Sequence, residues 1–203
     1  GADGEMGRPR LDLQMATIVT VLRSGGEYKP EHVKRLAAMV PGLICLSDVD
    51  VPGVECRPLS HDWPGWWSKM EAFGPSIEGD MLLMDLDTTV LRMPELPTVT
   101  TVLDDFYRPA LMGSGFMYVT EADRDLCWQE FIKNPKGHMA RCTTREAWGD
   151  QGFLMPFIGK RARWGANVRS YKVHCRNGIP KGTDVICFHG KPRPWDIVLP
   201  KQL

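Results

Sequence analysis

The chain has 203 residues, of which 43% are hydrophobic and 25% are charged, and its formal net charge at pH 7 is zero. This length and composition are typical of one globular domain with a sizeable core. No run of residues approaches the roughly eighteen apolar positions that a membrane-spanning helix needs, so we expect no transmembrane helix.

The N-terminal part of the chain predicts a leader followed by a strand, a helix and a second strand. Residues 1–14 are polar and glycine-rich without an apolar core, so we interpret them as a flexible leader rather than a signal peptide, and residues 15–203 as a single domain. Segment 16–22 is a β-rich apolar run that ends in a glycine turn. Proline at position 30 predicts a helix over 30–39, and segment 43–46 predicts the second strand.

The middle and C-terminal parts continue the alternation. We predict a short helix over 66–73, and the continuous apolar run 81–86 predicts a strand that is covered on both faces. Further along we expect the following elements: a strand over 116–119, a helix to about residue 132 opened by a Thr120–Asp123 capping box, a helix through Phe153 opened by a Thr143–Glu146 box, and strands over 168–173 and 185–188. Strands that alternate with helices indicate an α/β sandwich with a mostly parallel sheet, in which ligands bind at the carboxyl ends of the strands.

The cysteines are irregularly spaced. The chain contains no CxxC pair, which argues against a zinc site or a disulfide framework and favours reduced thiols in a cytoplasmic protein. The six residues are Cys45, Cys56, Cys127, Cys142, Cys175 and Cys187.

Positive charge is concentrated late in the chain. Between Gln151 and Thr183 there is no acidic residue. A segment of this kind either faces phosphate groups or forms a solvated surface whose partners are acids elsewhere in the chain, and both interpretations stay open. Its basic residues are Lys160, Arg161, Arg163, Arg169, Lys172, Arg176 and Lys181.

Two aspartates, Asp85 and Asp87, stand at the end of the apolar run 81–86. Residues two apart in a strand point to the same side, so both carboxylates can converge on one point. Two neighbouring carboxylates repel each other unless a cation lies between them, and Mg²⁺ or Mn²⁺ commonly bridges such oxygens to phosphate groups. The pattern therefore predicts a metal–diphosphate site, and the alternative is a loop with two solvated aspartates.

Four segments, in this order, resemble the GT-A glycosyltransferases related to glycogenin and to the bacterial galactosyltransferases of lipopolysaccharide synthesis. They are TIVTVLRSGGEY, LLMDLDTTVL, WGDQGFL and CFHGKPRPW. A fifth segment, HDWPGWWSKMEAF, is similar to compact bacterial and phage-type members of that family. The resemblance extends over residues 16–195 and implies a Rossmann-like domain that binds a nucleotide-sugar, with hexosyltransferase-like activity.

The resemblance assigns the donor nucleotide to the first strand and its turn. Tyr28 would stack on uracil, while Thr20, Val21 and Leu22 would line the base pocket. Lys69 would reach the ribose or the phosphates. The residues themselves leave two alternatives open, because Tyr28 could cap the following helix and Lys69 could cover the faces of neighbouring tryptophans.

The C-terminal segment would complete the metal and diphosphate sites. By the resemblance, His189 is the third metal ligand beside the two aspartates, although a lone histidine after a strand can equally be structural. Lys191 or Arg193 would neutralise the leaving diphosphate. The family usually places its lysine further from the histidine, so the choice between these two residues stays open.

The remaining carried-over residues would contact the transferred sugar. Asp150 would hold sugar hydroxyls and Gln151 would lie under the reacting carbon, so we expect these two residues to be catalytic; the alternative is an exposed helical dipeptide. Ser114, in the small-residue loop 113–115, would lie beneath the donor sugar.

Taken together, the resemblance implies transfer of a sugar from a UDP-sugar to an acceptor hydroxyl, with Mn²⁺ or Mg²⁺ and with retention at the anomeric carbon. Two acceptors are considered. One is a hydroxymethylated base in phage-type DNA, which the basic segment motivates. The other is a cell-envelope or small-molecule glycan. A third possibility, a nucleotide-binding module without catalysis, would predict a broken acidic pair or a missing histidine, and the sequence has neither.

Overall fold

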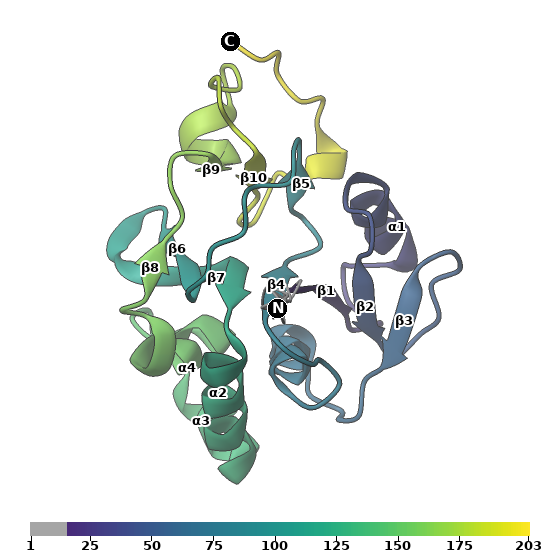
Figure 1. Cartoon of the computed structure of the whole chain (residues 1–203), viewed down its shortest axis with the longest axis vertical. Helices are drawn as coiled ribbons and strands as arrows, with labels where there is room; N and C mark the ends of the chain where they lie inside the picture. Colours follow the sequence, from purple (N-terminus) through teal and green to yellow (C-terminus); the bar gives the residue numbers. More distant parts are fainter. Residues whose placement is uncertain (1–15) are drawn as a thin grey trace, which may run out of the picture.

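The computed structural model describes residues 16–203, so the leader predicted over 1–14 lies outside the described residues. Figure 1 shows a large sheet in the middle of the molecule, a group of helices at one end and a small sheet near the C-terminus at the other. Among residues 16–203, no helix is both long enough and apolar enough to cross a membrane.

The large sheet has seven strands and is mixed, with mostly parallel pairs. Its spatial order is β3 (Glu55–Pro58), β2 (Ile44–Ser47), β1 (Thr17–Leu22), β4 (Met81–Met84), β7 (Arg108–Val119), β6 (Thr101–Asp105) and β8 (Ala162–Arg163). The first four strands are parallel, β7 is antiparallel to both β4 and β6, and β8 is parallel to β6. The predicted α/β class with a mostly parallel sheet is therefore confirmed, and the carboxyl ends of β1, β2 and β4 share one edge.

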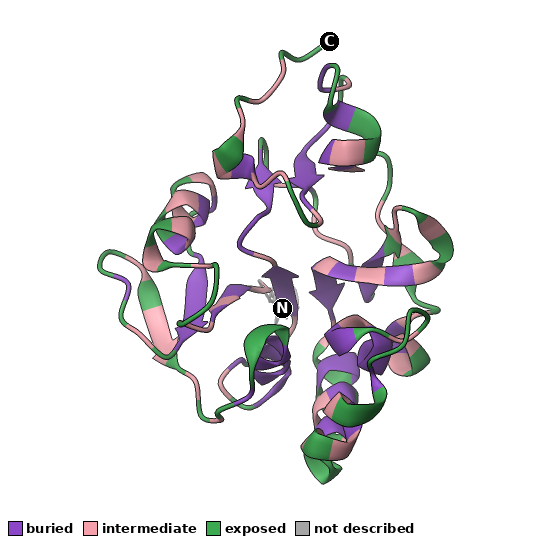
Figure 2. Cartoon of the chain, turned by 180° about the vertical axis from the view of Figure 1, so that it is seen from behind, coloured by how far each residue is buried: buried purple, intermediate pink, exposed green. Residues whose placement is uncertain are grey.

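Helices cover both faces of this sheet. On one face lie η1 (Gly65–Phe73), α2 (Glu121–Lys133) and α4 (Gly149–Ile158), and on the other lies α1 (Pro30–Met39). Strand β4 divides its side chains between the two cores, Met81 and Leu83 to the first, Leu82 and Met84 to the second. Figure 2 shows these central strands as buried. The prediction of a strand covered on both faces is confirmed.

A second sheet closes the far side of the site. It consists of β5 (Thr89–Val90), β10 (Val185–Cys187) and β9 (Val168–Ser170), with β10 in the centre. Because β5 begins two residues after Asp87 and β10 ends two residues before His189, this sheet brings the two halves of the predicted metal site to the same region.

Several predicted elements form where local signals are strong. Helix α1 runs over the predicted residues 30–39, and α2 begins after Thr120, whose hydroxyl accepts the N–H of Asp123 at 3.5 Å. The Thr143–Glu146 capping box is wrong. The Thr144 hydroxyl accepts the N–H of Ala147 in a local turn (3.1 Å), and the helix begins only at Gly149.

The strand predicted over 168–173 is too long. β9 ends at Ser170 because the Ser170 hydroxyl accepts the N–H of Val173 (3.2 Å) and starts the π-helical turn η2 (Tyr171–Cys175). Sequence patterns also missed β3, β6 and the helix α3 (Pro135–Arg141).

Candidate active site

The acidic pair lies in a tight turn that follows β4. The N–H of Asp85 donates to the carbonyl of Gly115 (2.9 Å), the N–H of Thr88 donates to the carbonyl of Asp85 (3.0 Å), and Arg35 of α1 donates to the carbonyl of Thr88 (3.0 Å). The strand itself ends at Met84. The turn after β4, rather than the alternation of side chains along a strand, therefore directs both carboxylates to the same side, where they line one cavity.

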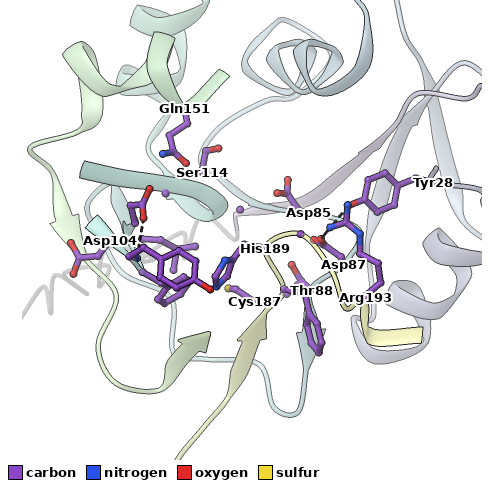
Figure 3. A pocket seen from close by; sticks show the side chains of 18 residues that line it. Tyr28, Asp85, Asp87, Thr88, Asp104, Ser114, Gln151, Cys187, His189 and Arg193 are labelled. Carbon is purple, nitrogen blue, oxygen red and sulfur yellow. Dashed lines mark hydrogen bonds and ion pairs between the residues drawn. The ribbon is translucent and has the colours of Figure 1, made fainter. Parts of the chain in front are cut away.

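One cavity gathers most of the predicted site residues. It has a volume of about 290 Å³, and we call it the acidic cavity. The predicted residues that line it are Tyr28, Asp85, Asp87, Ser114, Gln151, His189 and Arg193. In the view of Figure 3, Tyr28 and Arg193 lie on one side of Asp87 and His189 on the other. Residues from five separate parts of the sequence thus meet at one cavity.

Asp87 is buried and contacts two side chains. Its Oδ2 accepts hydrogen bonds from Arg193 Nη1 (2.5 Å) and from the Tyr28 hydroxyl (3.1 Å). Burial, together with the negative charge of Asp85, raises the pKa of Asp87 to about 7 in spite of Arg193. A cation that bound here at neutral pH would therefore displace a proton from Asp87.

Lys69 joins Asp85 to Asp150. Its buried ammonium lies 2.9 Å from Asp85 Oδ1 and 3.0 Å from Asp150 Oδ2, and the Ser114 hydroxyl donates to Asp150 Oδ2 (2.8 Å). Burial raises the pKa of Asp85, and Lys69 opposes that rise. Burial by itself lowers the pKa of Lys69. The negative charges of Asp150 and Asp85 have the larger effect, so the pKa of Lys69 is raised. Lys69 thus neutralises the buried Asp150 and the half-buried Asp85 rather than covering tryptophan faces.

The helix α4 positions the predicted sugar-contacting pair. Asp150 is buried and Gln151 is half-buried in the first turn of α4, where the helix dipole favours a carboxylate. Gln151 lines the acidic cavity, and Asp150 opens on a neighbouring one. The alternative of an exposed helical dipeptide is wrong.

His189 lines the acidic cavity with one nitrogen already bonded. Its Nε2 lies 2.6 Å from the Ser170 hydroxyl, and its ring stacks on Phe106 with centroids 5.3 Å apart. Burial, followed by the charge of Lys172, lowers the pKa of His189, so the ring is neutral. Only Nδ1 is left to bind another ligand.

The three predicted metal ligands do not form a ready-made site. Within residues 16–203, no group of three or more His, Cys, Asp or Glu side chains is arranged so that it could hold a metal ion. Since the two neighbouring carboxylates repel each other, each is paired with a cation of the chain, Lys69 for the half-buried Asp85 and Arg193 for the buried Asp87.

Three of the predicted donor-binding residues lie away from the cavities. Thr20 and Leu22 are fully buried, and the Thr20 hydroxyl donates to the carbonyl of Met84 (2.8 Å), because alternate residues of β1 point into the sheet core. The side chain of Lys191 is 70% exposed and pairs with Glu27 (3.0 Å). The expectation that Thr20 and Leu22 line the base pocket is therefore not met. Of the two residues considered for the diphosphate, Arg193 lines the acidic cavity and Lys191 does not.

A second cavity adjoins the acidic one at the end of β1. This strand-end cavity has a volume of about 400 Å³, and Val21, Tyr28, Lys69 and Arg193 line it. Tyr28 therefore borders both cavities. Its ring faces the Arg193 guanidinium at 5.2 Å, and it does not cap the following helix.

Two cationic residues near the cleft were missed by sequence reasoning. Arg23 lines the strand-end cavity and pairs with Asp48 at the end of β2 (2.8 Å). The turn η2 places Lys172 next to Gly190. A Cβ added at Gly190 would lie only 3.2 Å from the ammonium nitrogen of Lys172. We predicted a strand over 168–173, and a strand would not have brought Lys172 next to Gly190. The turn that replaces the end of that strand does so.

Part of the basic segment has acidic partners elsewhere in the chain. Arg161 makes a paired contact with Asp123 (2.7 and 2.9 Å), and Arg163 contacts Asp104 (2.8 Å). For these two arginines the structure supports a surface whose partners are acids of the same chain.

Comparison with solved structures supports the fold. The chain is similar to the crystal structure of the glycosyltransferase GlyE in Streptococcus pneumoniae TIGR4, with a TM-score of 0.58, 12% identity, and coverage of 90% of this chain and 56% of that one. For the apo form of GlyE the TM-score is 0.56, with 14% identity and coverage of 91% and 57%. No protein-family model and no curated protein matches the sequence. This chain therefore has a glycosyltransferase-type α/β fold and spans just over half the length of GlyE.

Proposed function

We propose that the protein is a glycosyltransferase of the GT-A type that takes a sugar from a UDP-sugar with the help of Mn²⁺ or Mg²⁺. One observation carries the proposal. Two carboxylates, the half-buried Asp85 and the buried Asp87, sit in the turn after a central strand of a glycosyltransferase-type fold, where Arg193 borders the same cavity. Membership of the glycogenin and lipopolysaccharide galactosyltransferase group and a cytoplasmic location remain predictions.

The charge of the site fits a cation. A divalent ion supplies charge neutralisation to a departing diphosphate, and carboxylate oxygens are its preferred ligands. In this proposal Asp85 and Asp87 would hold the ion, and His189, which lines the same cavity, would be a further ligand. Arg193 would exchange Asp87 for a donor phosphate, which a bidentate guanidinium suits well.

The residues around Lys69 would hold the sugar. Asp150 and Ser114 form a connected polar pair next to Gln151, and such groups bind sugar hydroxyls. The bond between the anomeric carbon and the diphosphate oxygen breaks while an acceptor oxygen bonds to the same face of that carbon. Because the new bond forms on the face that the diphosphate leaves, the anomeric configuration is retained, and the acceptor proton passes to the departing phosphate oxygen.

Arg193 and Lys191 offer a matched comparison for the diphosphate. We expect Arg193→Met to weaken UDP binding by about 10- to 100-fold, the effect of losing charge-assisted hydrogen bonds in a partly buried place. Lys191→Met should change UDP binding by less than about threefold, because its ammonium is exposed and screened. Calorimetric titration with UDP in Mn²⁺ measures both, and a larger effect at Lys191 would reverse the assignment.

The proposed function is tested by a donor screen. UDP-glucose, UDP-galactose, UDP-N-acetylglucosamine and GDP-mannose are each incubated with the protein and Mn²⁺, and release of the nucleoside diphosphate is measured, with EDTA as the control. We expect release from at least one UDP-sugar and none with EDTA. Binding of UDP without release would identify a nucleotide-binding module, and the absence of both would overturn the proposal.

The acceptor is the least defined part of the proposed reaction. A hydroxymethylated base in DNA and a glycan both offer the hydroxyl that the chemistry needs. The pairing of Arg161 and Arg163 with acids of the chain removes part of the reason for choosing DNA. The residues that line a further cavity help to decide between a glycan and DNA as the acceptor.

A further inference from the structure

A third cavity opens beside the predicted sugar-contacting residues. It has a volume of about 580 Å³, and we call it the tryptophan cavity. It shares Asp85, Ser114 and Gln151 with the acidic cavity, so a molecule bound in it reaches the place where the sugar would be transferred. The residues that line it are Trp66, Lys69, Asp85, Asp105, Arg108, Ser114, Arg145, Trp148, Asp150, Gln151 and Gly190.

Two exposed tryptophans form one wall of this cavity. Trp66 is 53% exposed and Trp148 is 54% exposed, and their ring centroids are 6.1 Å apart. Large aromatic side chains placed together on a surface mark binding sites, because leaving them in water is unfavourable.

The backbone holds these rings in place. Gly149 has φ +60°, and a Cβ added to it would lie 2.7 Å from Trp66 Nε1, so the indole rests directly on the peptide chain. Trp148 is fixed by its bridge to Thr143 and by the start of α4. The platform is therefore built into the fold.

The geometry of the rings favours a sugar over a nucleobase. Their planes are inclined by 43°. A base held between two rings needs parallel planes roughly 7 Å apart, twice an ordinary contact distance. Inclined neighbouring rings instead form a continuous curved surface. The C–H face of a pyranose carries partial positive charge and packs on the negative face of such rings.

The charges around the platform support the same choice. Arg108 is already engaged, with Nη2 3.2 Å from Asp105 and Nη1 donating to the carbonyl of Arg145 (2.6 Å). Within residues 16–203, the Arg145 guanidinium has no carboxylate partner. The three aspartates of the cavity are paired with Lys69 and Arg108, so Arg145 is the one cation among the lining residues that is available to a ligand. A polyphosphate backbone needs several available cations, whereas one suits the hydroxyls or a single acid of a sugar.

We propose that Trp66 and Trp148 form the acceptor subsite, which binds a pyranose ring of a glycan and directs one of its hydroxyls toward Gln151. This inference rests on the proposed function for its chemistry. It assigns the acceptor to the carbohydrates rather than to DNA. Of the two tryptophans, Trp148 lines neither the acidic cavity nor the strand-end cavity, whereas Trp66 also borders the strand-end cavity, so Trp148 is the residue that separates acceptor binding from donor binding.

The test measures binding without turnover. Wild-type protein, Trp148→Ala, Trp148→Tyr and the control Leu126→Ala, an exposed residue of α2, are titrated with maltotriose, cellotriose and lactose in the presence of UDP and Mn²⁺, followed by saturation-transfer NMR. A single-stranded oligonucleotide of about a dozen nucleotides is titrated in parallel. UDP affinity and melting temperature are measured for every variant.

We expect at least one oligosaccharide to bind the wild type, and Trp148→Ala to weaken that binding about tenfold, the size of one lost aromatic contact. Trp148→Tyr should recover most of the loss, and Leu126→Ala should bind like the wild type. Trp66→Leu, which keeps an apolar side chain without a ring, should behave like Trp148→Ala.

Three outcomes would overturn the inference. The wild type could bind none of the oligosaccharides, it could bind the oligonucleotide through Trp148 instead, or Trp148→Ala and Trp148→Tyr could lose UDP affinity and melting temperature together with glycan binding. In the first two cases, intact UDP binding by the wild type would leave the proposed function standing. Loss of UDP binding in the wild type itself would refute the proposed function instead.

Discussion

Replacing Asp87 by asparagine is expected to lower cation-dependent release of UDP from the donor by roughly a hundredfold or more, while the protein stays folded. The amide has nearly the same size and can still accept hydrogen bonds from Tyr28 and Arg193. It carries no charge, however, so it is a poor ligand for Mn²⁺. Burial already raises the pKa of Asp87 to about 7, so at neutral pH the neutral form is populated about as much as the charged one. Since the folded protein already accommodates an uncharged side chain here, the substitution should leave the fold intact.

Calorimetric titration with Mn²⁺ and a UDP-release assay measure this effect, and circular dichroism reports whether the variant is folded. Asp50→Asn is the matched control, because Asp50 is exposed and lines none of the three cavities described above. The control should match the wild type in all three measurements. Undiminished Mn²⁺ binding by Asp87→Asn, or full activity of the wild type in excess EDTA, would count against the cation site.

Replacing Lys69 by methionine is expected to reduce the free energy of unfolding by about 3–5 kcal/mol. The side chain of Lys69 is only 10% exposed, and its ammonium neutralises both Asp85 and Asp150. Methionine fills a similar volume but leaves the buried carboxylate of Asp150 without a positive charge, while Asp85, whose side chain is 38% exposed, keeps contact with solvent. Breaking a buried ion pair at one partner is costly for this reason, whereas an exposed pair contributes little.

Urea unfolding at neutral pH measures the difference, and Lys133→Met is the matched control. Lys133 also pairs with an acid, Glu130, but its side chain is 66% exposed, so its loss should change stability by no more than about 0.5 kcal/mol. Added Mn²⁺ should recover part of the stability of Lys69→Met, because a bound cation stabilises the folded state. Equal stability of the two variants would show that Lys69 does not hold the acids in place.

The sequence alone was sufficient for elements with strong local signals. Helix α1 has a proline at its first position and a Pro-Gly pair just after its end, and the structure keeps both limits. The apolar run that forms β4 predicted burial on both faces, since a strand without polar alternation has no side suited to water. These signals depend on residues within one turn or one strand, so no distant contact is needed to interpret them.

Other elements depend on contacts between distant segments. β6 pairs with β7 through irregular register, and its polar end, Asp104 and Asp105, gives no clear alternation. β9 stops at Ser170 because one hydroxyl bonds to the backbone of the next turn. Nothing in the local hydrophobic pattern of these segments distinguishes a strand from a turn, and the choice is made by what packs against them.

For the candidate site, the order of residues is enough to identify the chemical groups and to place the acidic pair after a buried strand. Which of these groups meet depends on the folded chain. It placed Arg193 rather than Lys191 on Asp87, engaged Lys69 between two acids, and set Trp66 beside Trp148 at the mouth of the cleft. The physical reason is that charge pairing and side-chain stacking act through space over a few ångströms, between residues that may be a hundred positions apart along the chain.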